Sequence, residues 1–100
     1  IEYPASLIHY HVGWFQDTIP VTAPDIGPIA LLRLDGDWYE STKICIDTLG
    51  PKVASGGIVV IDDYGKWPGC KLAVNEYLSR LPRQVLLNHI DPSARYFLVP

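Results

Sequence analysis

Several features are scarce in this 100-residue sequence, and each scarcity excludes a class of protein. Only two cysteines occur, Cys45 and Cys70, and their spacing is not that of a metal site or a disulfide framework. We therefore expect both to be reduced thiols. No apolar run approaches the roughly 20 residues of a membrane-spanning helix, and no hydrophobic leader opens the chain. These features predict a soluble, cytoplasmic protein with no membrane partner.

Positive charge and phosphate-binding motifs are also scarce. The eight basic residues are scattered and the formal net charge is -3, so the sequence predicts no basic surface for nucleic acid. The glycine-containing stretches "SGG" and "GDWYES" do not match the loops that bind nucleoside triphosphates. We therefore expect neither a nucleic-acid partner nor a bound triphosphate.

Apolar residues, by contrast, are plentiful. They make up 48% of the chain, with three tryptophans among them, which is enough to form the core of one small domain. Their spacing predicts an alternating α/β order. In chain order we expect a strand within residues 7–12, a loop at 21–28, a strand at 29–34, a helix at 38–49, a strand at 58–61, a helix at 72–81, a buried strand at 84–90 and a short strand at 94–100. The apolar run at 29–34 is typical of a parallel strand covered on both faces.

Two of the expected strands end in paired carboxylates. Asp35 and Asp37 follow the first, and Asp62 and Asp63 follow the second. Consecutive crossovers place the carboxyl ends of parallel strands side by side, where ligands bind in open α/β sheets. Four carboxylates at one edge repel each other unless a cation offsets their charge, and oxygen ligands suit Mg²⁺. The alternative is structural, because an aspartate in the position of Asp37 often caps a helix.

Other polar and aromatic residues near strand ends carry weaker signals. The three histidines, of which His11 is a weak candidate base, are more often structural than catalytic. Glu40 sits where a negative charge favours the positive end of a helix dipole. All three tryptophans lie in or beside expected strand-end loops, and for Trp67 pocket lining and packing are equally compatible with the sequence.

The stretches "LLRLDGDWYEST" and "GGIVVIDDYGKWPGC" resemble the macrocin O-methyltransferase family of S-adenosylmethionine- and Mg²⁺-dependent sugar O-methyltransferases. The resemblance covers about residues 12–77. It implies a class I methyltransferase fold in which Asp35 is a metal ligand and the catalytic base. Asp62 and Asp63 complete the metal ligands, and Asp37 caps a helix or supports a ligand. The acceptor it implies is a small molecule containing a sugar.

Members of that family are longer than this chain. Their glycine-rich turn and the acidic residue for the cofactor ribose should precede Ile1, so the resemblance implies no cofactor-binding residue here. We expect residues 1–100 to be a partial methyltransferase domain: the C-terminal, metal and acceptor half of a Rossmann-like sheet, mostly parallel with an antiparallel last strand. The N-terminal half that binds S-adenosylmethionine is then absent, and the chain alone is expected to be inactive.

Two other functions remain compatible with the sequence. In one, the chain acts as it stands, as a non-enzymatic metal-binding or self-assembling module. In the other, "DGD" is the metal-binding motif of a glycosyltransferase, although the second acidic pair fits that class poorly. A half-domain also exposes an edge and an apolar face beside the strand at 29–34, and we therefore expect the chain to form a homo-oligomer.

Overall fold

A computed structural model describes residues 4–100 and shows one mixed sheet of four strands. The strands are β1 (Ile29–Leu34), β2 (Val53–Ile61), β3 (Asn88–His89) and β4 (Arg95–Leu98). Their order in the sheet is β1-β2-β4-β3. β1 and β2 pair in parallel, whereas β4 is antiparallel to both of its neighbours. Three strands therefore run the same way and the last one is reversed, as predicted.

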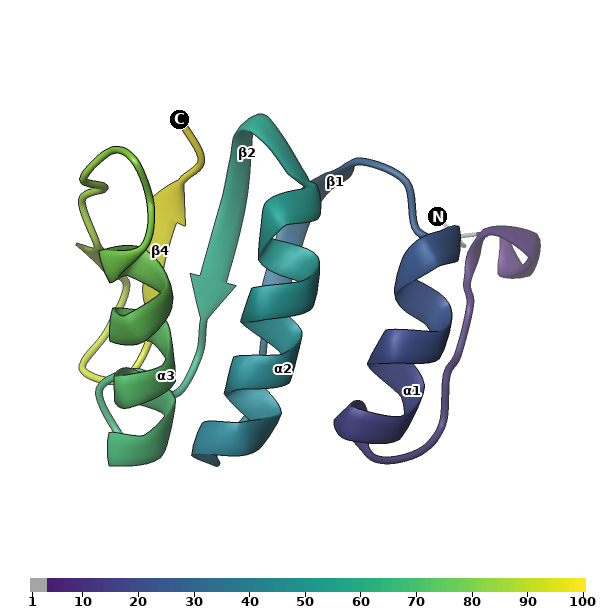
Figure 1. The fold of residues 1–100 in the computed structure, drawn as a ribbon, viewed down its shortest axis with the longest axis horizontal. Coiled ribbons are helices and arrows are strands. Elements are labelled where there is room, and N and C mark those ends of the chain that lie inside the picture. Colours follow the sequence, from purple (N-terminus) through teal and green to yellow (C-terminus); the bar gives the residue numbers. More distant parts are fainter. Residues whose placement is uncertain (1–3) are drawn as a thin grey trace.

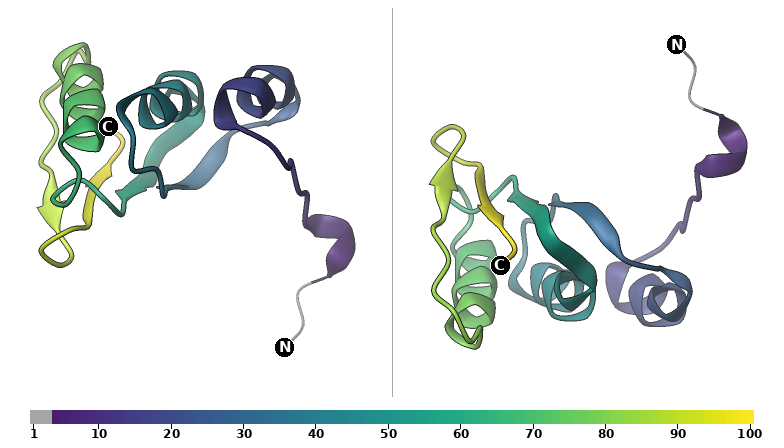
Figure 2. Two further views of the ribbon diagram at one scale, coloured as in Figure 1. Left: turned by 90° about the horizontal axis from the view of Figure 1, so that it is seen from below. Right: turned by 90° about the horizontal axis from the view of Figure 1, so that it is seen from above.

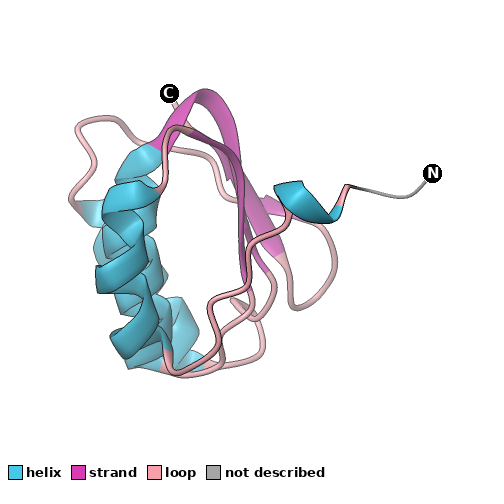
Figure 3. Cartoon of the chain, turned by 90° about the vertical axis from the view of Figure 1, so that its right-hand side faces the viewer, coloured by secondary structure: helices cyan, strands magenta, loops and turns pink. Residues whose placement is uncertain are grey.

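Three helices lie against one face of this sheet. They are α1 (Phe15–Thr22), α2 (Tyr39–Leu49) and α3 (Pro68–Ser79), and short 3-10 turns occur at Ala5–Leu7, Ala23–Asp25 and Gly50–Lys52. Figures 2 and 3 show all three helices on the same side of the strands. The helices also begin at one end of the molecule, the end toward which β1 and β2 run (Figure 1). Within residues 4–100, no helix combines the length and apolar character needed to cross a bilayer.

The core lies between the sheet and the helices. In α2, the buried positions Thr42, Cys45, Ile46 and Leu49 recur at helical spacing, which is why this segment forms a helix with one apolar stripe. Val59 and Ile61 of β2 and Phe97 of β4 meet this stripe from the sheet, and all three are almost fully buried. Burial raises the pKa of the Cys45 thiol to about 11, so this cysteine stays protonated at neutral pH.

The opposite face of the sheet has no helix over it in the described part of the chain. Side chains alternate along a strand, so Leu31 of β1 points away from the helices and is 60% exposed. Leu31 pairs with Ile58, and Ile58 pairs with Leu98, which is 56% exposed. These residues, with Val60 and Tyr96 beside them, form what we call the uncovered face. The expectation that β1 is covered on both faces is therefore wrong for residues 4–100.

Several predicted elements agree with the structure. The strand at 29–34 has the predicted bounds, and the helix at 38–49 starts one residue later. The strand at 58–61 is the second half of the longer β2. The helix predicted at 72–81 begins earlier, at Pro68, because proline suits the first turn of a helix, where no backbone N–H is needed. The last strand lies within the predicted 94–100.

Three of the expected elements differ from the structure. Residues 8–12 form no strand, and α1 follows them although Pro20 lies inside it. Packing of Ile19 against the core helps to offset the hydrogen bond that Pro20 removes. The predicted loop at 21–28 is reduced to 26–28 by the end of α1 and a 3-10 turn. Only Asn88–His89 of the predicted strand at 84–90 joins the sheet, and it is an exposed edge rather than a buried strand.

The uncovered face predicts self-association of the 100-residue chain. Replacing two exposed leucines by charge, in the double variant Leu31→Lys/Leu98→Lys, should convert an associated species into a monomer, because charged side chains oppose burial of this face. Sedimentation velocity at micromolar concentration measures the change. Leu72→Lys, at an exposed position on α3, is the matched control and should leave association unchanged. A wild-type chain that sediments as a monomer contradicts the prediction.

Candidate functional site

The carboxyl ends of β1 and β2 bring the two acidic pairs together. Leu34 pairs with Ile61, and the backbone N–H of Asp62 donates to the carbonyl of Leu34 across 3.0 Å. Asp35 and Asp62 therefore leave neighbouring strands at the same level. The hydroxyl of Ser93, in the turn before β4, donates to the backbone carbonyl of Asp62 at 2.6 Å and fixes this corner. We call Asp35, Asp37, Asp62 and Asp63 the carboxylate cluster.

Asp63 is one of the two half-buried residues of the carboxylate cluster. Its Oδ2 atom is buried and has no hydrogen-bond partner among residues 4–100. Burial raises the pKa of this carboxyl, and the charge of Asp37 and the close Asp35 carboxyl raise it further. A buried carboxylate oxygen without a partner is costly in a folded protein. The position favours either a bound proton or a cation.

The carboxylate of Asp62, unlike that of Asp63, has an ion-pair partner among the described residues. Arg33, on the uncovered face of β1, forms an ion pair with the Asp62 carboxylate. The same guanidinium lies 3.8 Å from Asp35. Any cation that binds Asp62 has to compete with Arg33 for this carboxylate, whereas Asp63 makes no such pair among the described residues.

The donor chemistry of the cluster fits a hard divalent cation, although the side chains do not form a ready metal site. Within residues 4–100, no three His, Cys, Asp or Glu side chains are arranged to hold a metal ion. Asp63 lies close to Asp35 and Asp37, whereas Asp62 forms an ion pair with Arg33. Every side chain of the cluster offers carboxylate oxygens, which are the ligands that Mg²⁺ takes, and the orphaned Oδ2 of Asp63 is the strongest sign of fit.

Asp37 does not cap the helix that follows it, so the capping expectation is wrong. The residue at the N-cap of α2 is Trp38, and no side chain there bonds to the helix N-terminus. Asp37 is exposed and lines a cavity of about 240 Å³ together with Asp35. Glu40 lies in the first turn of α2, as expected for a charge that favours the helix dipole.

The same cavity has a second wall that sequence reasoning missed. Its lining comes from the start of α1 and the start of α2: residues 13–16, 35–38 and Ser41. The alternating pattern before Phe15 favours a strand, so the sequence does not predict α1, the helix that forms this wall. The available signal was the polar run after Phe15, which is compatible with a helix once Pro20 is tolerated. None of the histidines lines this cavity.

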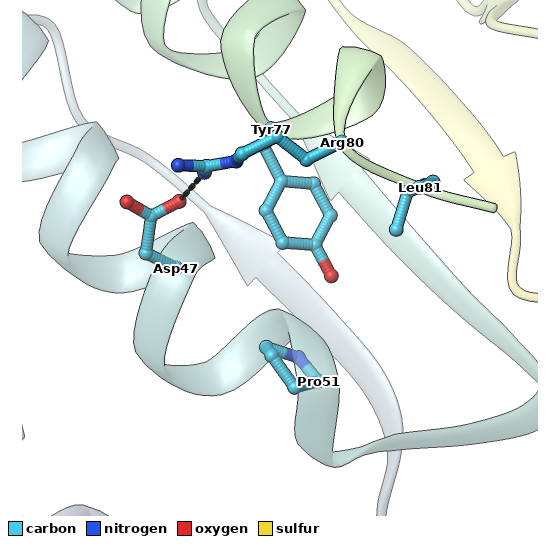
Figure 4. Close-up of a pocket in the computed structure, with 5 residues that line it drawn as sticks. All are labelled: Asp47, Pro51, Tyr77, Arg80 and Leu81. Atoms are coloured by element: carbon cyan, nitrogen blue, oxygen red, sulfur yellow. Dashed lines mark hydrogen bonds and ion pairs between the residues drawn. The ribbon is translucent and has the colours of Figure 1, made fainter.

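Larger hollows lie at the opposite end of the helices. One, of about 420 Å³, is lined by Asp47, Pro51, Tyr77, Arg80 and Leu81 (Figure 4). Arg80 is already paired with Asp47, and burial raises the pKa of the Tyr77 hydroxyl. A neighbouring hollow of about 430 Å³ shares Tyr77. Neither offers the convergent carboxylates of the smaller cavity, so chemistry rather than volume identifies the candidate site.

The reversed last strand and the acidic ends of β1 and β2 together define part of a class I methyltransferase fold, and comparison with known proteins agrees. Residues 4–98 match the Macrocin-O-methyltransferase (TylF) family. The chain belongs to this family. The glycosyltransferase alternative gains no support from the match.

Curated relatives are O-methyltransferases. Demethyldecarbamoylnovobiocin O-methyltransferase of Streptomyces niveus is 46% identical over 90 residues, which is 90% of this chain and 34% of that protein. The 8-demethyl-8-(2,3-dimethoxy-alpha-L-rhamnosyl)-tetracenomycin-C 4'-O-methyltransferase of Streptomyces olivaceus is 42% identical over 84% of this chain and 31% of that protein. The chain thus spans about a third of the length of these relatives.

Solved structures share the fold. The O-methyltransferase NovP superimposes with a TM-score of 0.82 at 46% identity, over 89% of this chain and 36% of that one. CalS11, a TDP-rhamnose 3'-O-methyltransferase, gives 0.70 at 29% identity, over 86% of this chain and 39% of that one. MycE, solved with Mg, SAH and mycinamycin VI, gives 0.57 at 21% identity, a likeness of fold alone.

Replacing Asp63 by asparagine tests the electrostatics of the cluster. A carboxyl whose pKa is raised by folding destabilises the folded state as pH rises from its unfolded value, about 3.9, through its folded value. Below that window both states are protonated and the effect is absent. We therefore expect Asp63→Asn to raise the melting temperature more at about pH 7 than at about pH 3, in EDTA.

The measurement is thermal unfolding by circular dichroism at both pH values. Asp25→Asn, at an exposed carboxyl outside the cluster, is the control and should show no such difference. If Asp63→Asn changes the melting temperature equally at the two pH values, folding does not raise the pKa of the Asp63 carboxyl in solution.

Proposed function

We propose that the chain is the metal- and acceptor-binding part of an S-adenosylmethionine- and Mg²⁺-dependent O-methyltransferase that methylates a hydroxyl of a sugar or of a sugar-bearing natural product. One observation carries the proposal: the carboxylate cluster, with its orphaned Asp63 oxygen, lies next to a cavity at the carboxyl ends of β1 and β2. Family membership supports methyl transfer, and two relatives are named for rhamnose or rhamnosyl compounds.

In this proposal Asp35 and Asp63 hold Mg²⁺, joined by Asp62 once its pair with Arg33 is released. Mg²⁺ held there would supply the positive charge that lowers the pKa of an acceptor hydroxyl. The cavity wall beside Asp35 and Asp37 orients that hydroxyl and limits the access of water. S-adenosylmethionine would supply the methyl group from its sulfonium: the S–CH₃ bond would break as the O–CH₃ bond forms, and S-adenosylhomocysteine would leave.

A carboxylate has to accept the proton that the hydroxyl loses. The family resemblance assigns this role to Asp35. Asp37 is a second candidate, because it caps no helix and lines the same cavity. A carboxylate that holds a cation is a weaker base than a free one, which favours Asp37 if Asp35 is occupied by the metal.

We further propose that the residues that bind S-adenosylmethionine lie in the part of the longer family members that this chain does not span. Within residues 4–100, no strand is followed by the glycine-rich turn that receives a dinucleotide-like cofactor in Rossmann-type folds. The non-enzymatic alternative, a self-assembling metal-binding module, is favoured by a different observation, the uncovered face with its exposed leucines.

Calorimetric titration with Mg²⁺, followed by S-adenosylmethionine, tests the proposal. We expect Mg²⁺ to bind the 100-residue chain and Asp63→Asn to reduce the affinity at least about tenfold, because a ligand of a hard cation is lost. Asp35→Asn should act similarly. Asp37→Asn should have a smaller effect, because we propose that Asp37 is not a ligand. Asp25→Asn, at an exposed carboxyl outside the cluster, is the control.

The titration also separates the alternatives. If S-adenosylmethionine does not bind while Mg²⁺ does, the cofactor half lies elsewhere, as proposed. Tight binding of the cofactor would show instead that the chain, alone or as an oligomer, holds a complete cofactor site. Unchanged Mg²⁺ affinity in both Asp35→Asn and Asp63→Asn would remove the metal site from the cluster.

A further inference from the structure

All three tryptophans occupy the same structural position. Trp14 is the N-cap of α1, Trp38 that of α2 and Trp67 that of α3. Each has an extended backbone, as N-cap residues do. Because the three helices begin at one end of the molecule (Figure 1), their N-cap residues lie at the end that carries the carboxylate cluster.

Helix stability does not explain these positions. An N-cap residue stabilises a helix when its side chain accepts a hydrogen bond from a backbone N–H, which is worth about 1 kcal/mol. Indole has a donor and no acceptor, and none of these three N-caps makes a side-chain capping bond. Each α-helix within residues 4–100 therefore begins with a residue that does not cap it.

Core packing does not explain the positions of Trp14 and Trp38 either. Trp14 is 74% exposed and Trp38 is 71% exposed. Both line the cavity of about 240 Å³, beside Asp35 and Asp37. The Trp67 ring lies 6.0 Å from the Trp38 ring, centroid to centroid, with the two planes tilted by 39°. The cavity therefore has aromatic walls and carboxylates at its edge.

We propose that Trp14 and Trp38, with Trp67 packed beside Trp38, form an aromatic rim that binds a pyranose ring of the acceptor by its apolar face and holds its hydroxyls toward Asp35 and Asp37. A pyranose presents C–H groups on its faces and hydroxyls around its edge, which matches apolar indole next to acceptor-only carboxylates. Trp67 does not line the cavity itself; it packs against the core, with its ring beside that of Trp38 at a tilt of 39°. This inference rests on the proposed function and adds the residues that position its substrate.

The test follows the three indole N–H signals of the ¹⁵N-labelled 100-residue chain by NMR. The probe is methyl α-L-rhamnopyranoside, titrated with and without Mg²⁺, and adenosine is titrated separately as a flat aromatic probe. We expect the sugar to shift the indole signals in a saturable way. Trp38→Ala should weaken the sugar about fivefold to tenfold, as expected when a stacking face is lost.

Two further variants separate stacking from folding. Trp38→Phe keeps an aromatic face and should restore most of the affinity, which a purely structural role of Trp38 does not require. Leu86→Ala removes an exposed apolar side chain that does not line the cavity and should bind sugar as the wild type does. Sugar affinity that is unchanged in Trp38→Ala overturns the rim, and so does the absence of any indole shift with sugar. Indole shifts with adenosine alone overturn it as well, in favour of a flat ligand.

The outcome is independent of the metal titration. If the sugar shifts the indole signals but Mg²⁺ does not bind the carboxylate cluster, the rim stands and the methyl-transfer proposal loses its metal. If Mg²⁺ binds and no sugar shift occurs, the metal site stands and the rim is wrong.

Discussion

The parallel pairing of β1 with β2 is the constraint on which the candidate site depends. Leu34 lies opposite Ile61, and the residues that follow both strands therefore share one edge. Each strand is followed by a loop and a helix that returns over the same face, so α2 and α3 also begin at this edge. A slip of one residue would turn every side chain of β1 to the other face of the sheet and move Asp35 away from Asp63.

The rest of the fold compensates for a site that is poor in stabilising interactions. Four carboxylates repel one another, a buried oxygen of Asp63 has no partner among the described residues, and three helices start without a capping side chain. Burial of apolar side chains between the sheet and the helices offsets these costs. The side chains that are completely shielded from water include Ile46, Val59, Ile61 and Val74. Separation of core and site along the strands lets one end of the sheet carry unfavourable groups while the middle remains well packed.

The sequence predicts those parts of this structure in which the pattern is local and strong. β1 and α2 follow from a continuous apolar run and a helical stripe, and the paired carboxylates follow from their positions directly after strands. The sequence does not predict α1, because Pro20 and the alternating residues before it favour other structures locally, whereas tertiary packing of Ile19 stabilises the helix. The pair between Arg33 and Asp62 joins residues far apart in the chain through side-chain orientation, which no spacing rule encodes.

That ion pair links the two unusual regions of the molecule. Arg33 lies on the uncovered face, where 61% of its side chain is exposed, and its guanidinium reaches over the sheet edge to Asp62. Any chain segment or second copy that packs on this face removes water from the guanidinium, and the attraction between Arg33 and Asp62 then acts through a lower dielectric. Docking on the sheet and release of Asp62 to a cation therefore oppose each other, and by linkage a cation that takes Asp62 changes the free energy of docking by the same amount.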